Sequence, residues 1–280
     1  MFFLGIKYIR LPYYQGFAAQ LSFYLLLSVV PAVILLSQLL GVFDISLEVI
    51  EDLISEYVYA EAIETFRGFI GQAPNMPMNA LFLLVALWSA SRIQFSMIRV
   101  MNLTMTDGQR KGGGFLKDRF KAIKIILFTL FAITFAIVIA VYGEMLLRML
   151  FDPITRALEI EYEVDRLWML LRWPSAMLLY FSMVSYNYYA LPYEKVKFKA
   201  VLPGSLFASA SMLLVTYLYS IYMAHVAHFD IIYGSLAIAV ALMIWFFLLS
   251  WALVIGIVFN KVYHETKENI ETEVEEEYYE

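Results

Sequence analysis

Long runs of apolar residues, separated by shorter polar segments, set the pattern of this 280-residue chain. Each run is about as long as, or longer than, the ~20 residues that an α-helix needs to cross the hydrocarbon of a bilayer. The pattern predicts an all-α fold, a polytopic bundle of six transmembrane helices forming one domain over residues 1–264. The expected spans are 17–43, 78–102, 125–150, 167–191, 202–224 and 231–262.

A different pattern occupies residues 46–71, between the first and second apolar runs. Apolar residues recur there at helical spacing, and acidic residues occupy the other side. This arrangement is typical of an amphipathic helix, which we expect on the extracytoplasmic surface or as a cap on the bundle. Residues 265–280 are acidic with few apolar positions, and we expect them to form a disordered cytoplasmic tail.

Basic residues predict the orientation of the chain. They concentrate near the N-terminus and in the segments 110–124, 195–199 and 261–267, whereas the remaining loops hold few. Six spans with both termini in the cytoplasm satisfy the positive-inside rule at every loop. The glycines at 112–114 are expected to form a flexible hinge, since no phosphate-loop pattern follows them.

Composition supports the membrane assignment. Hydrophobic residues make up 62% of the chain and charged residues 16%, whereas soluble domains average about half and about a quarter. Much of the net charge of -5 comes from the acidic segment at the C-terminus. Cysteine is absent, so disulfide and thiolate chemistry are excluded.

The most informative polar residues lie in the second expected span, which we expect to be one unbroken helix. Arg92 and Arg99 are seven residues apart and therefore share a helix face. Arg92 is expected below the bilayer midplane, where a charge is costly and is usually kept for a function. Arg99 is expected to extend to the cytoplasmic headgroups. The other candidates for binding a substrate, an anion or a lipid are Ser89, Ser96, Asn102, Ser28 and Tyr217.

Two interpretations of Arg92 stay open at this point. A functional Arg92 would bind an anion or an anionic headgroup, because a guanidinium stays protonated and offers a planar fork of donors. A structural Arg92 would instead be buried and bonded to carbonyl groups that a neighbouring helix kink sets free. The sequence favours neither interpretation over the other.

Chemistry beyond binding has little support in the sequence. His225, His228 and Asp230 are weak candidates for a metal site, because no fourth ligand accompanies them. Nucleophile-elbow, HExxH and Walker patterns are absent. We therefore expect no enzyme activity, no metal or other cofactor, and no nucleic-acid partner.

Several segments together resemble the YihY/virulence factor BrkB family of bacterial inner-membrane proteins. They are residues 18–31, 87–92 with 99–102, 233–237 and the region around Trp245. The resemblance implies six spans with cytoplasmic termini in the bacterial cytoplasmic (inner) membrane, and transport-like activity. A ribonuclease label used in the family has no support in these residues. The family often ends its last span with Gly-Ala-Glu-x-Asn, whereas this chain has Val258 in place of the glutamate.

The leading functional hypothesis is a transporter or flippase-like protein for an anionic or amphiphilic substrate, with Arg92 in a cavity of the bundle. The alternative is a non-transport membrane scaffold, whose acidic tail and outer amphipathic helix engage other envelope proteins. Membrane lipids, and anionic headgroups in particular, are the expected partners. The sequence leaves the oligomeric state open.

Overall fold

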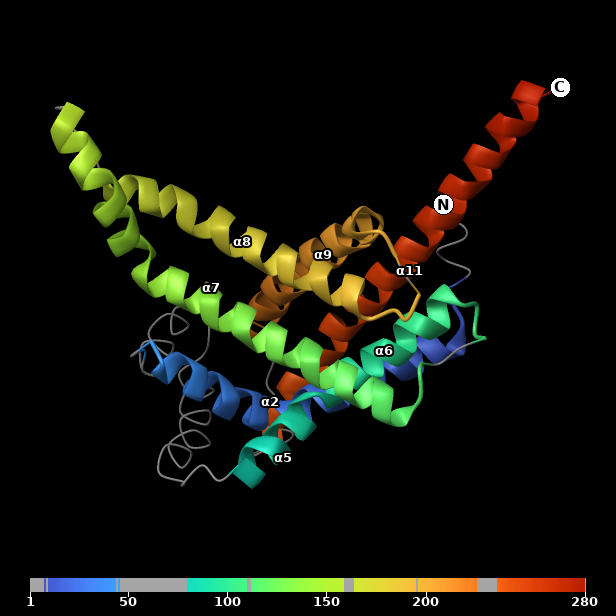
Figure 1. Cartoon of the computed structure of the whole chain (residues 1–280). Coiled ribbons are helices and arrows are strands. Elements are labelled where there is room, and N and C mark those ends of the chain that lie inside the picture. The colour runs from blue at the N-terminus through green and yellow to red at the C-terminus, as the bar shows by residue number, and fades with distance from the viewer. Residues whose placement is uncertain are drawn as a thin grey trace. The chain divides into compact units, whose positions relative to one another are not determined.

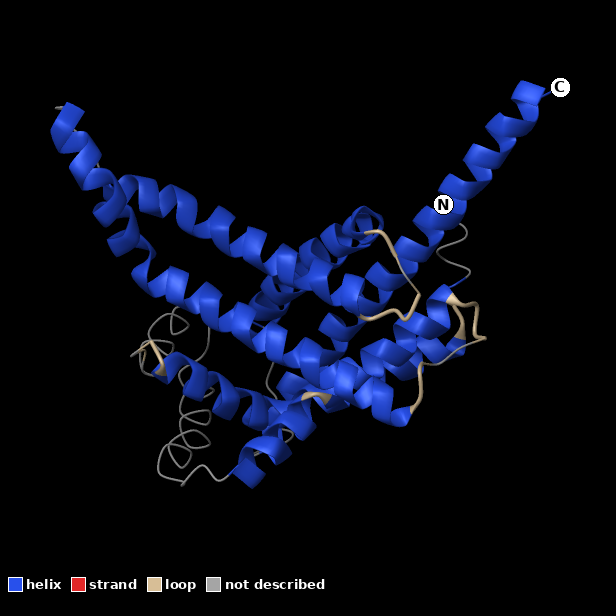
Figure 2. Cartoon of the chain, viewed as in Figure 1, coloured by secondary structure: helices blue, strands red, loops and turns tan. Residues whose placement is uncertain are grey.

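A computed structural model of the chain describes residues 8, 10–43, 45, 80–109, 112–158, 164–194, 196–225 and 236–279. Within these ranges the chain consists of helices and short connections, with no strand (Figure 2). The predicted all-α fold class is therefore confirmed for the described residues. The helices, labelled in Figure 1, are α2 (Pro12–Gly41), α5 (Ala80–Ala90), α6 (Arg92–Met105), α7 (Phe115–Leu158), α8 (Val164–Ala190), α9 (Phe198–His225) and α11 (Ala237–Tyr279).

Four of the described helices contain stretches that are long and apolar enough to cross a membrane. These stretches overlap the first, third, fifth and sixth predicted spans, which confirms a multi-pass membrane protein. Six spans and their orientation stay a prediction, and the amphipathic helix predicted at 46–71 lies outside the described residues. The four stretches are Tyr13–Gly41, Phe115–Ile139, Phe198–Met223 and Ala239–Thr266.

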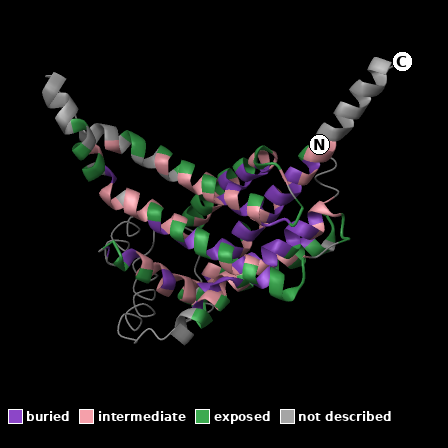
Figure 3. Ribbon diagram, in the orientation of Figure 1, coloured by how far each residue is buried: buried purple, intermediate pink, exposed green. Residues whose placement is uncertain are grey.

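The second predicted span is not a single helix, which corrects the expectation from the sequence. α5 ends at Ala90, Ser91 forms a turn, and α6 begins at Arg92. α6 is amphipathic: Arg92 and Arg99 are exposed, and most of its other side chains are buried. Figure 3 shows the burial of each segment of the chain. The buried residues of α6 are Gln94, Ser96, Met97, Ile98, Val100, Met101, Asn102 and Thr104.

The chain divides into two compact units, each described on its own. Unit 1 comprises residues 1–32, 77–126 and 184–280, and unit 2 comprises residues 33–76 and 127–183. In unit 2 the Tyr142 hydroxyl donates a hydrogen bond to the Phe43 carbonyl at 3.2 Å. Trp168 of α8 lies so close to Gly143 of α7 that a Cβ at that glycine would collide with the indole. All the candidate site residues placed by the structure belong to unit 1.

Close packing joins α9 to α11 within unit 1. Gly204 and Gly256 face one another, and a Cβ on Gly204 would collide with the Gly256 carbonyl oxygen. Pro203 cannot donate a main-chain hydrogen bond and disturbs the helical pattern around it. Asn260 compensates from α11: its Oδ1 accepts from the Gly204 amide at 2.7 Å, and its Nδ2 donates to the Val201 carbonyl at 3.1 Å. Asn260 thus joins the two helices where glycines allow their backbones to approach.

The acidic tail is helical, which differs from the expectation of a disordered segment. α11 continues beyond its apolar stretch as far as Tyr279. Glutamate and lysine have high helix propensity, so a charged segment continuous with a stable helix can prolong it. An i, i+4 ion pair between Lys261 and Glu265, at 3.2 Å, supports the helix where the polar segment begins.

The glycines at 112–114 form a closely packed turn, which replaces the hinge expected from the sequence. A Cβ on Gly112 would collide with the Asp118 carboxylate, and one on Gly113 would lie 2.6 Å from the Tyr193 ring. Gly114 has a φ of +107°, a conformation that favours glycine. Glycine is needed in this turn because other segments of unit 1 lie against its backbone.

Candidate functional site

Side chains from two helices and from the turn residue Ser91 bond the carbonyl groups at the end of α5. A helix leaves its last carbonyls without intrahelical partners. The Trp88 carbonyl accepts hydrogen bonds from the Ser91 hydroxyl at 2.9 Å and from the Arg119 guanidinium of α7 at 2.6 Å. The Ser89 carbonyl accepts the hydroxyl of Ser28, on α2, at 3.1 Å. These donors explain how the chain breaks its helix at Ser91 without a proline or glycine there.

Arg119 is the buried arginine of this region, with only 5% of its surface exposed. Its guanidinium carbon lies 3.8 Å from the centre of the Trp88 ring and 5.5 Å from that of Phe95. Phe115, one turn earlier on α7, meets Phe95 edge to face at 5.7 Å. Such cation–π contacts attract the guanidinium to the faces of the rings. Its Nε has no hydrogen-bond partner among the described residues.

Arg119, and not Arg92, therefore occupies the structural role that was one interpretation of Arg92. It is buried, and it bonds a carbonyl group at a helix break. Sequence reasoning missed this because it grouped Arg119 with the basic residues that set orientation. A usable signal exists in the spacing: Arg119, Ala122 and Ile126 recur at helical intervals, and all three are buried.

Arg92 and Arg99 lie on the exposed face of α6. Arg92 is thus on a surface of unit 1. The interruption before it is one residue long: the Ser91 amide donates to the Leu87 carbonyl at 2.9 Å, and the Ser91 carbonyl accepts the Phe95 amide at 3.0 Å. The Arg99 guanidinium stacks over Phe95 at 4.5 Å. Arg119 bonds the Trp88 carbonyl, and Arg92 begins α6 four residues after Trp88, so the two arginines flank the same interruption. In the part of the chain that is described, none of the three arginines forms an ion pair.

Ser28 and Ser89 meet at the helix break through the bond between hydroxyl and carbonyl described above. Ser96 is buried, and its hydroxyl has no hydrogen-bond partner among the described residues. Tyr217 is 64% exposed on α9, and its carbonyl accepts the Ser220 hydroxyl at 2.8 Å. The structure therefore brings the two serines to the arginines, whereas no described contact brings Tyr217 to them.

Asn102 makes contacts that position a loop. Its amide nitrogen donates to the Ile98 carbonyl at 2.6 Å, and its amide oxygen accepts the main-chain N–H of Tyr193 at 2.9 Å. The Tyr193 ring lies 4.1 Å from the Lys121 ammonium. Burial, followed by a hydrogen bond with Asp118, raises the pKa of the Tyr193 hydroxyl. Asn102 thus belongs to a loop-anchoring cluster at the far end of α6 from Arg92.

The same cluster fixes the start of α7. Asp118 is 4% exposed, and its carboxylate accepts the Gly113 amide at 2.8 Å. The Lys121 ammonium donates to the carbonyls of Leu191 at 2.9 Å and Pro192 at 2.7 Å, in the turn that follows α8. Because these bonds engage both charged groups, the cluster holds two loops together and offers no free charge to a ligand.

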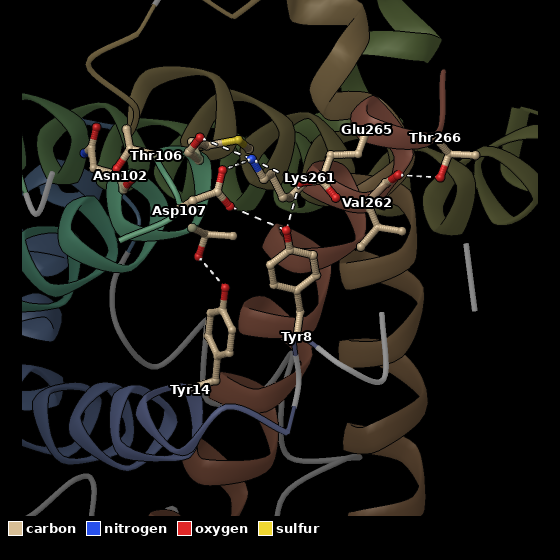
Figure 4. A network of polar contacts seen from close by, with 11 residues as sticks. Tyr8, Tyr14, Asn102, Thr106, Asp107, Lys261, Val262, Glu265 and Thr266 are labelled. Atoms are coloured by element: carbon tan, nitrogen blue, oxygen red, sulfur yellow. Dashed lines mark hydrogen bonds and ion pairs between the residues drawn. The ribbon is translucent and has the colours of Figure 1, made fainter. Parts of the chain in front are cut away.

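Another polar network joins Tyr8, near the N-terminus, to the turn that follows α6 and to the interior of α11 (Figure 4). The Lys261 ammonium lies 2.9 Å from the Asp107 carboxylate and 3.2 Å from that of Glu265. The Tyr8 hydroxyl donates to Glu265 at 2.8 Å and lies 3.4 Å from Asp107. Burial, and then the hydrogen bond to Glu265, raise the pKa of Tyr8. This network links three segments that are far apart in the sequence.

The weak metal candidates are placed only in part. His225 ends α9, whereas His228 and Asp230 lie outside the described residues. Among the residues with described positions, no group of three or more His, Asp or Glu side chains is arranged to hold a metal ion. The candidate site consequently consists of the arginines and aromatic rings at the α5–α6 break.

Residues 13–277 match the sequence profile of the family described as Virulence factor BrkB. The match extends over nearly the whole chain. The chain belongs to the Virulence factor BrkB family. The resemblance that its motifs showed is thereby confirmed, and the BrkB motif at 87–92 is the segment that contains the helix break.

Two relatives show how far the likeness extends. YfkH of Bacillus subtilis (strain 168), whose name describes it as ribonuclease-like, is 27% identical over 256 residues, which are 90% of this chain and 91% of YfkH. A UPF0761 membrane protein of Pseudoalteromonas translucida (strain TAC 125) is 36% identical over 76 residues, which are 26% of this chain and 25% of that protein. No solved structure matches the chain.

The position where the BrkB family often carries a glutamate is packed in this BrkB protein. Val258 is 1% exposed in α11, between Gly256 and Asn260, which both contact α9. A mechanism that depends on a carboxylate at this place therefore does not apply to this chain. Its charged candidate residues are the arginines of α6 and α7.

Proposed function

We propose that this BrkB-family protein is a transporter or flippase-like protein for an anionic or amphiphilic substrate, in the bacterial cytoplasmic membrane. Arg92 provides the binding surface, with Arg119 fixed behind it. The observation that carries the proposal is that two arginines flank one helix interruption without a carboxylate partner among the described residues: Arg119 bonds the Trp88 carbonyl, and the exposed Arg92 begins the helix that follows. A bound anion would supply the missing negative charge, and an exposed Arg92 is able to reach it.

The supporting geometry differs from the cavity expected from the sequence. Arg92 is exposed at the first residue of α6, whereas Arg119 is held by the Trp88 ring and carbonyl. A held charge next to an exposed one suits transient binding, because the exposed side chain is accessible to a substrate while the held one stays in place. A guanidinium also offers two parallel donors to a phosphate or a carboxylate.

An amphiphilic substrate also needs an apolar surface, and unit 1 offers one. An open, largely apolar groove of about 240 Å³ lies between α2 and α11. Both helices contain candidate membrane spans, which favours a groove that is open to the acyl chains of a bilayer. The Ser22 hydroxyl at its wall is already bonded to the Met243 carbonyl at 2.9 Å, which leaves the groove without a free donor there. The lining residues are Ala19, Ser22, Phe23, Met243, Ile244 and Phe247.

Reconstituted vesicles test the proposal directly. The purified protein is placed in liposomes that carry acyl-labelled phosphatidylglycerol or acyl-labelled phosphatidylcholine, and movement between leaflets is followed by quenching from outside. Wild type is expected to move the anionic lipid faster, and Arg92→Gln to slow it by about tenfold or more, since a charge-assisted hydrogen bond contributes about 1.5–3 kcal/mol.

Lys117→Gln is the matched control. Lys117 is exposed on the same helix as Arg119, about 200° away around the axis. The substitution removes one positive charge without touching the break. The Lys117→Gln protein is therefore expected to move the anionic lipid at the wild-type rate. An Arg92→Gln protein that folds normally and still moves the anionic lipid at the wild-type rate overturns the proposal.

The alternative function is a membrane scaffold. The observation that favours it is the continuation of α11 as an acidic helix beyond its apolar stretch, to Tyr279. Truncation after Thr266 removes this helix and leaves the arginines in place. If the protein is a scaffold, truncation abolishes binding of partner proteins and Arg92→Gln preserves it. If it is a transporter, truncation preserves lipid movement and Arg92→Gln slows it.

The proposal contains no catalytic step. The word ribonuclease-like in the name of YfkH raises RNA cleavage as a competing activity for this chain. Incubating the purified protein with end-labelled RNA tests it. Cleavage that copurifies with the protein and disappears in a variant of one of its own residues would replace the transport proposal.

A further inference from the structure

We propose that an arginine–aromatic ladder on α5, α6 and α7 binds an anionic lipid, with the charged headgroup on Arg92 and the acyl chain against the rings of Trp88 and Phe115. This inference rests on the proposed function and narrows its substrate to a charged lipid, in place of a soluble anion. The ladder consists of Trp88 on α5, Arg92, Phe95 and Arg99 on α6, and Phe115 and Arg119 on α7.

The spacing of the ladder along α5 and α6 is the first step of the argument. Ser91 has helical backbone angles, and helical hydrogen bonds run through it: its amide donates to the Leu87 carbonyl at 2.9 Å, and its carbonyl accepts the Phe95 amide at 3.0 Å. Helical spacing therefore continues across the interruption, and residues at intervals of four, three and four positions share one face. The residues at these intervals are Trp88, Arg92, Phe95 and Arg99.

Ring and guanidinium contacts connect this face to α7. The Arg99 guanidinium lies 4.5 Å from the centre of the Phe95 ring. The centre of the Phe115 ring lies 6.4 Å from that of Trp88 and 5.7 Å from that of Phe95. Arg119 is buried and bonds both the ring and the carbonyl of Trp88, so it positions this ring and leaves contact with the ligand to Arg92.

The accessible part of the ladder is both apolar and charged. Trp88 is 43% exposed and Phe115 58%, while Arg92 and Arg99 are exposed on the same side of α6. Leu84, one turn before Trp88, is exposed as well. A hydrated anion bound to Arg92 would leave these apolar side chains uncovered, whereas a lipid covers them with its acyl chain. A ligand that is anionic at one end and apolar along its length therefore fits this surface.

Charge determines which headgroup is preferred. Among the described residues no carboxylate forms an ion pair with an arginine of the ladder, so an anionic headgroup would supply the negative charge. A choline headgroup carries a quaternary ammonium, which binds to the faces of aromatic rings. The rings of Trp88 and Phe95 already hold guanidinium groups, which repel a further cation. The ladder is therefore expected to prefer phosphatidylglycerol to phosphatidylcholine.

Arginines interleaved with aromatic rings also occur in proteins that bind single-stranded nucleic acid. The residues exposed beside this ladder favour a lipid, because Leu84 and Val85 are apolar and would lie against the hydrated backbone of a nucleic acid. An RNA oligonucleotide is accordingly one of the competitors in the test.

Quenching by brominated acyl chains tests the inference, because bromine quenches tryptophan fluorescence only at short range. The full-length protein in a neutral detergent is mixed with phosphatidylglycerol or phosphatidylcholine that carry the same brominated chains. Trp88 is one of five tryptophans, and the Trp88→Phe protein gives the quenching of the others. Trp88 is expected to be half-quenched at a mole fraction of phosphatidylglycerol about tenfold lower than that of phosphatidylcholine.

A second reporter locates the acyl chain. In the Trp88→Phe protein, or in wild type should that protein fail to fold, Phe115→Trp places a reporter in the ladder and Phe120→Trp is the matched control. Phe120 is exposed on the same helix, between the exposed Lys117 and Lys124. Phosphatidylglycerol is expected to quench more strongly than phosphatidylcholine at position 115 and equally at position 120. A preference at both positions would show that anionic lipid gathers at any basic surface; that result, or a preference at neither position, overturns the inference.

Headgroup variants and competitors complete the test. Arg92→Gln is expected to abolish the preference for phosphatidylglycerol at Trp88, and Lys117→Gln to preserve it; a preference retained in a folded Arg92→Gln protein overturns the inference. Glycerophosphoglycerol, the deacylated form of phosphatidylglycerol, is expected not to displace the brominated lipid. Displacement by an equal concentration of this soluble headgroup would show that the acyl chain is not recognised, and displacement by the RNA oligonucleotide would assign the ladder to nucleic acid.

The binding measurement and the vesicle measurement distinguish the two hypotheses. If phosphatidylglycerol binds at Trp88 through Arg92 but no lipid moves in vesicles, only the transport proposal fails. If Arg92 controls lipid movement but the quenching of Trp88 shows no preference for phosphatidylglycerol, only the present inference fails.

Discussion

The Arg119 guanidinium stacks on the Trp88 ring at 3.8 Å and donates a hydrogen bond to the carbonyl of the same residue at 2.6 Å. One side chain of α7 thus stabilises both the end of α5 and the ring beside it. Because the Trp88 carbonyl lies in the last turn of α5, the contact stabilises the interruption of the helix as well as the packing of α7.

Replacement of Arg119 by glutamine is expected to destabilise the protein by about 2–4 kcal/mol. The estimate adds a charge-assisted hydrogen bond of about 1.5–3 kcal/mol to a cation–π contact of about 0.5–2 kcal/mol, with allowance for overlap. Chemical unfolding in mixed micelles measures the change. Arg119→Lys should recover part of the loss, because an ammonium stacks on the ring without the planar fork.

The control for this prediction is Lys117→Gln, which should stay within about 0.5 kcal/mol of wild type because Lys117 is exposed. An Arg119→Gln protein as stable as Lys117→Gln would show that the contact with Trp88 does not stabilise the break.

The helical fold and its apolar stretches could be predicted from the sequence because both depend on local properties. Long apolar runs identify helices that suit a membrane, whatever their neighbours are. The break at Ser91 could not be predicted in this way. Residues 87–93 contain no proline or glycine, and the interruption depends on donors from Ser28 and Arg119, which are remote in the chain.

Only part of the candidate site can be predicted from the sequence, because the rest depends on contacts between remote segments. Arg92 and Arg99 share an exposed face of α6, as their spacing of seven indicates. The burial of Arg119 depends on the ring of Trp88, which sequence spacing does not reveal. Arg119 therefore went unnoticed among the surrounding basic residues, although it is the most buried arginine of the three.

Gly204→Ala is expected to destabilise the packing of α9 on α11 by about 1–3 kcal/mol or more. A Cβ at this position would collide with the Gly256 carbonyl and the Asn260 side chain, and backbone atoms cannot move aside cheaply. Thermal unfolding, monitored by fluorescence, measures the loss of stability.

Gly16→Ala is the control, since a Cβ on Gly16 in α2 meets nothing within 4 Å. It should stabilise α2 by up to about 1 kcal/mol, and equal effects of the two substitutions would contradict the packing argument.

Gly113→Ala is expected to destabilise the turn before α7, by about 1–2 kcal/mol, because its Cβ would lie 2.6 Å from the Tyr193 ring. A double-mutant cycle with Tyr193→Ala isolates this clash. Once the ring is removed, Gly113→Ala should lower the free energy of unfolding by much less. The two substitutions together then destabilise the protein by less than the sum of their separate effects. Strictly additive losses would show that the alanine acts through the backbone of the turn alone.

Tyr8→Phe is expected to change how stability depends on alkaline pH. The pKa of Tyr8 is raised in the folded protein by burial and then by its hydrogen bond to Glu265, whereas in the unfolded chain it lies at about 10. A group with a raised folded pKa contributes stability that is complete below its unfolded pKa and is lost as the pH rises through the folded value.

Wild type should therefore exceed Tyr8→Phe in stability by about 1 kcal/mol at neutral pH, the value of the hydrogen bond to Glu265. The advantage should shrink as the pH rises above about 10, because ionised Tyr8 would face the carboxylates of Glu265 and Asp107. The free energy of unfolding of both proteins is measured from neutral pH to about pH 11. Lysine titration is common to both proteins and therefore cancels in the difference between them. An advantage that stays constant or grows over this range would mean that Tyr8 does not remain neutral in contact with Glu265.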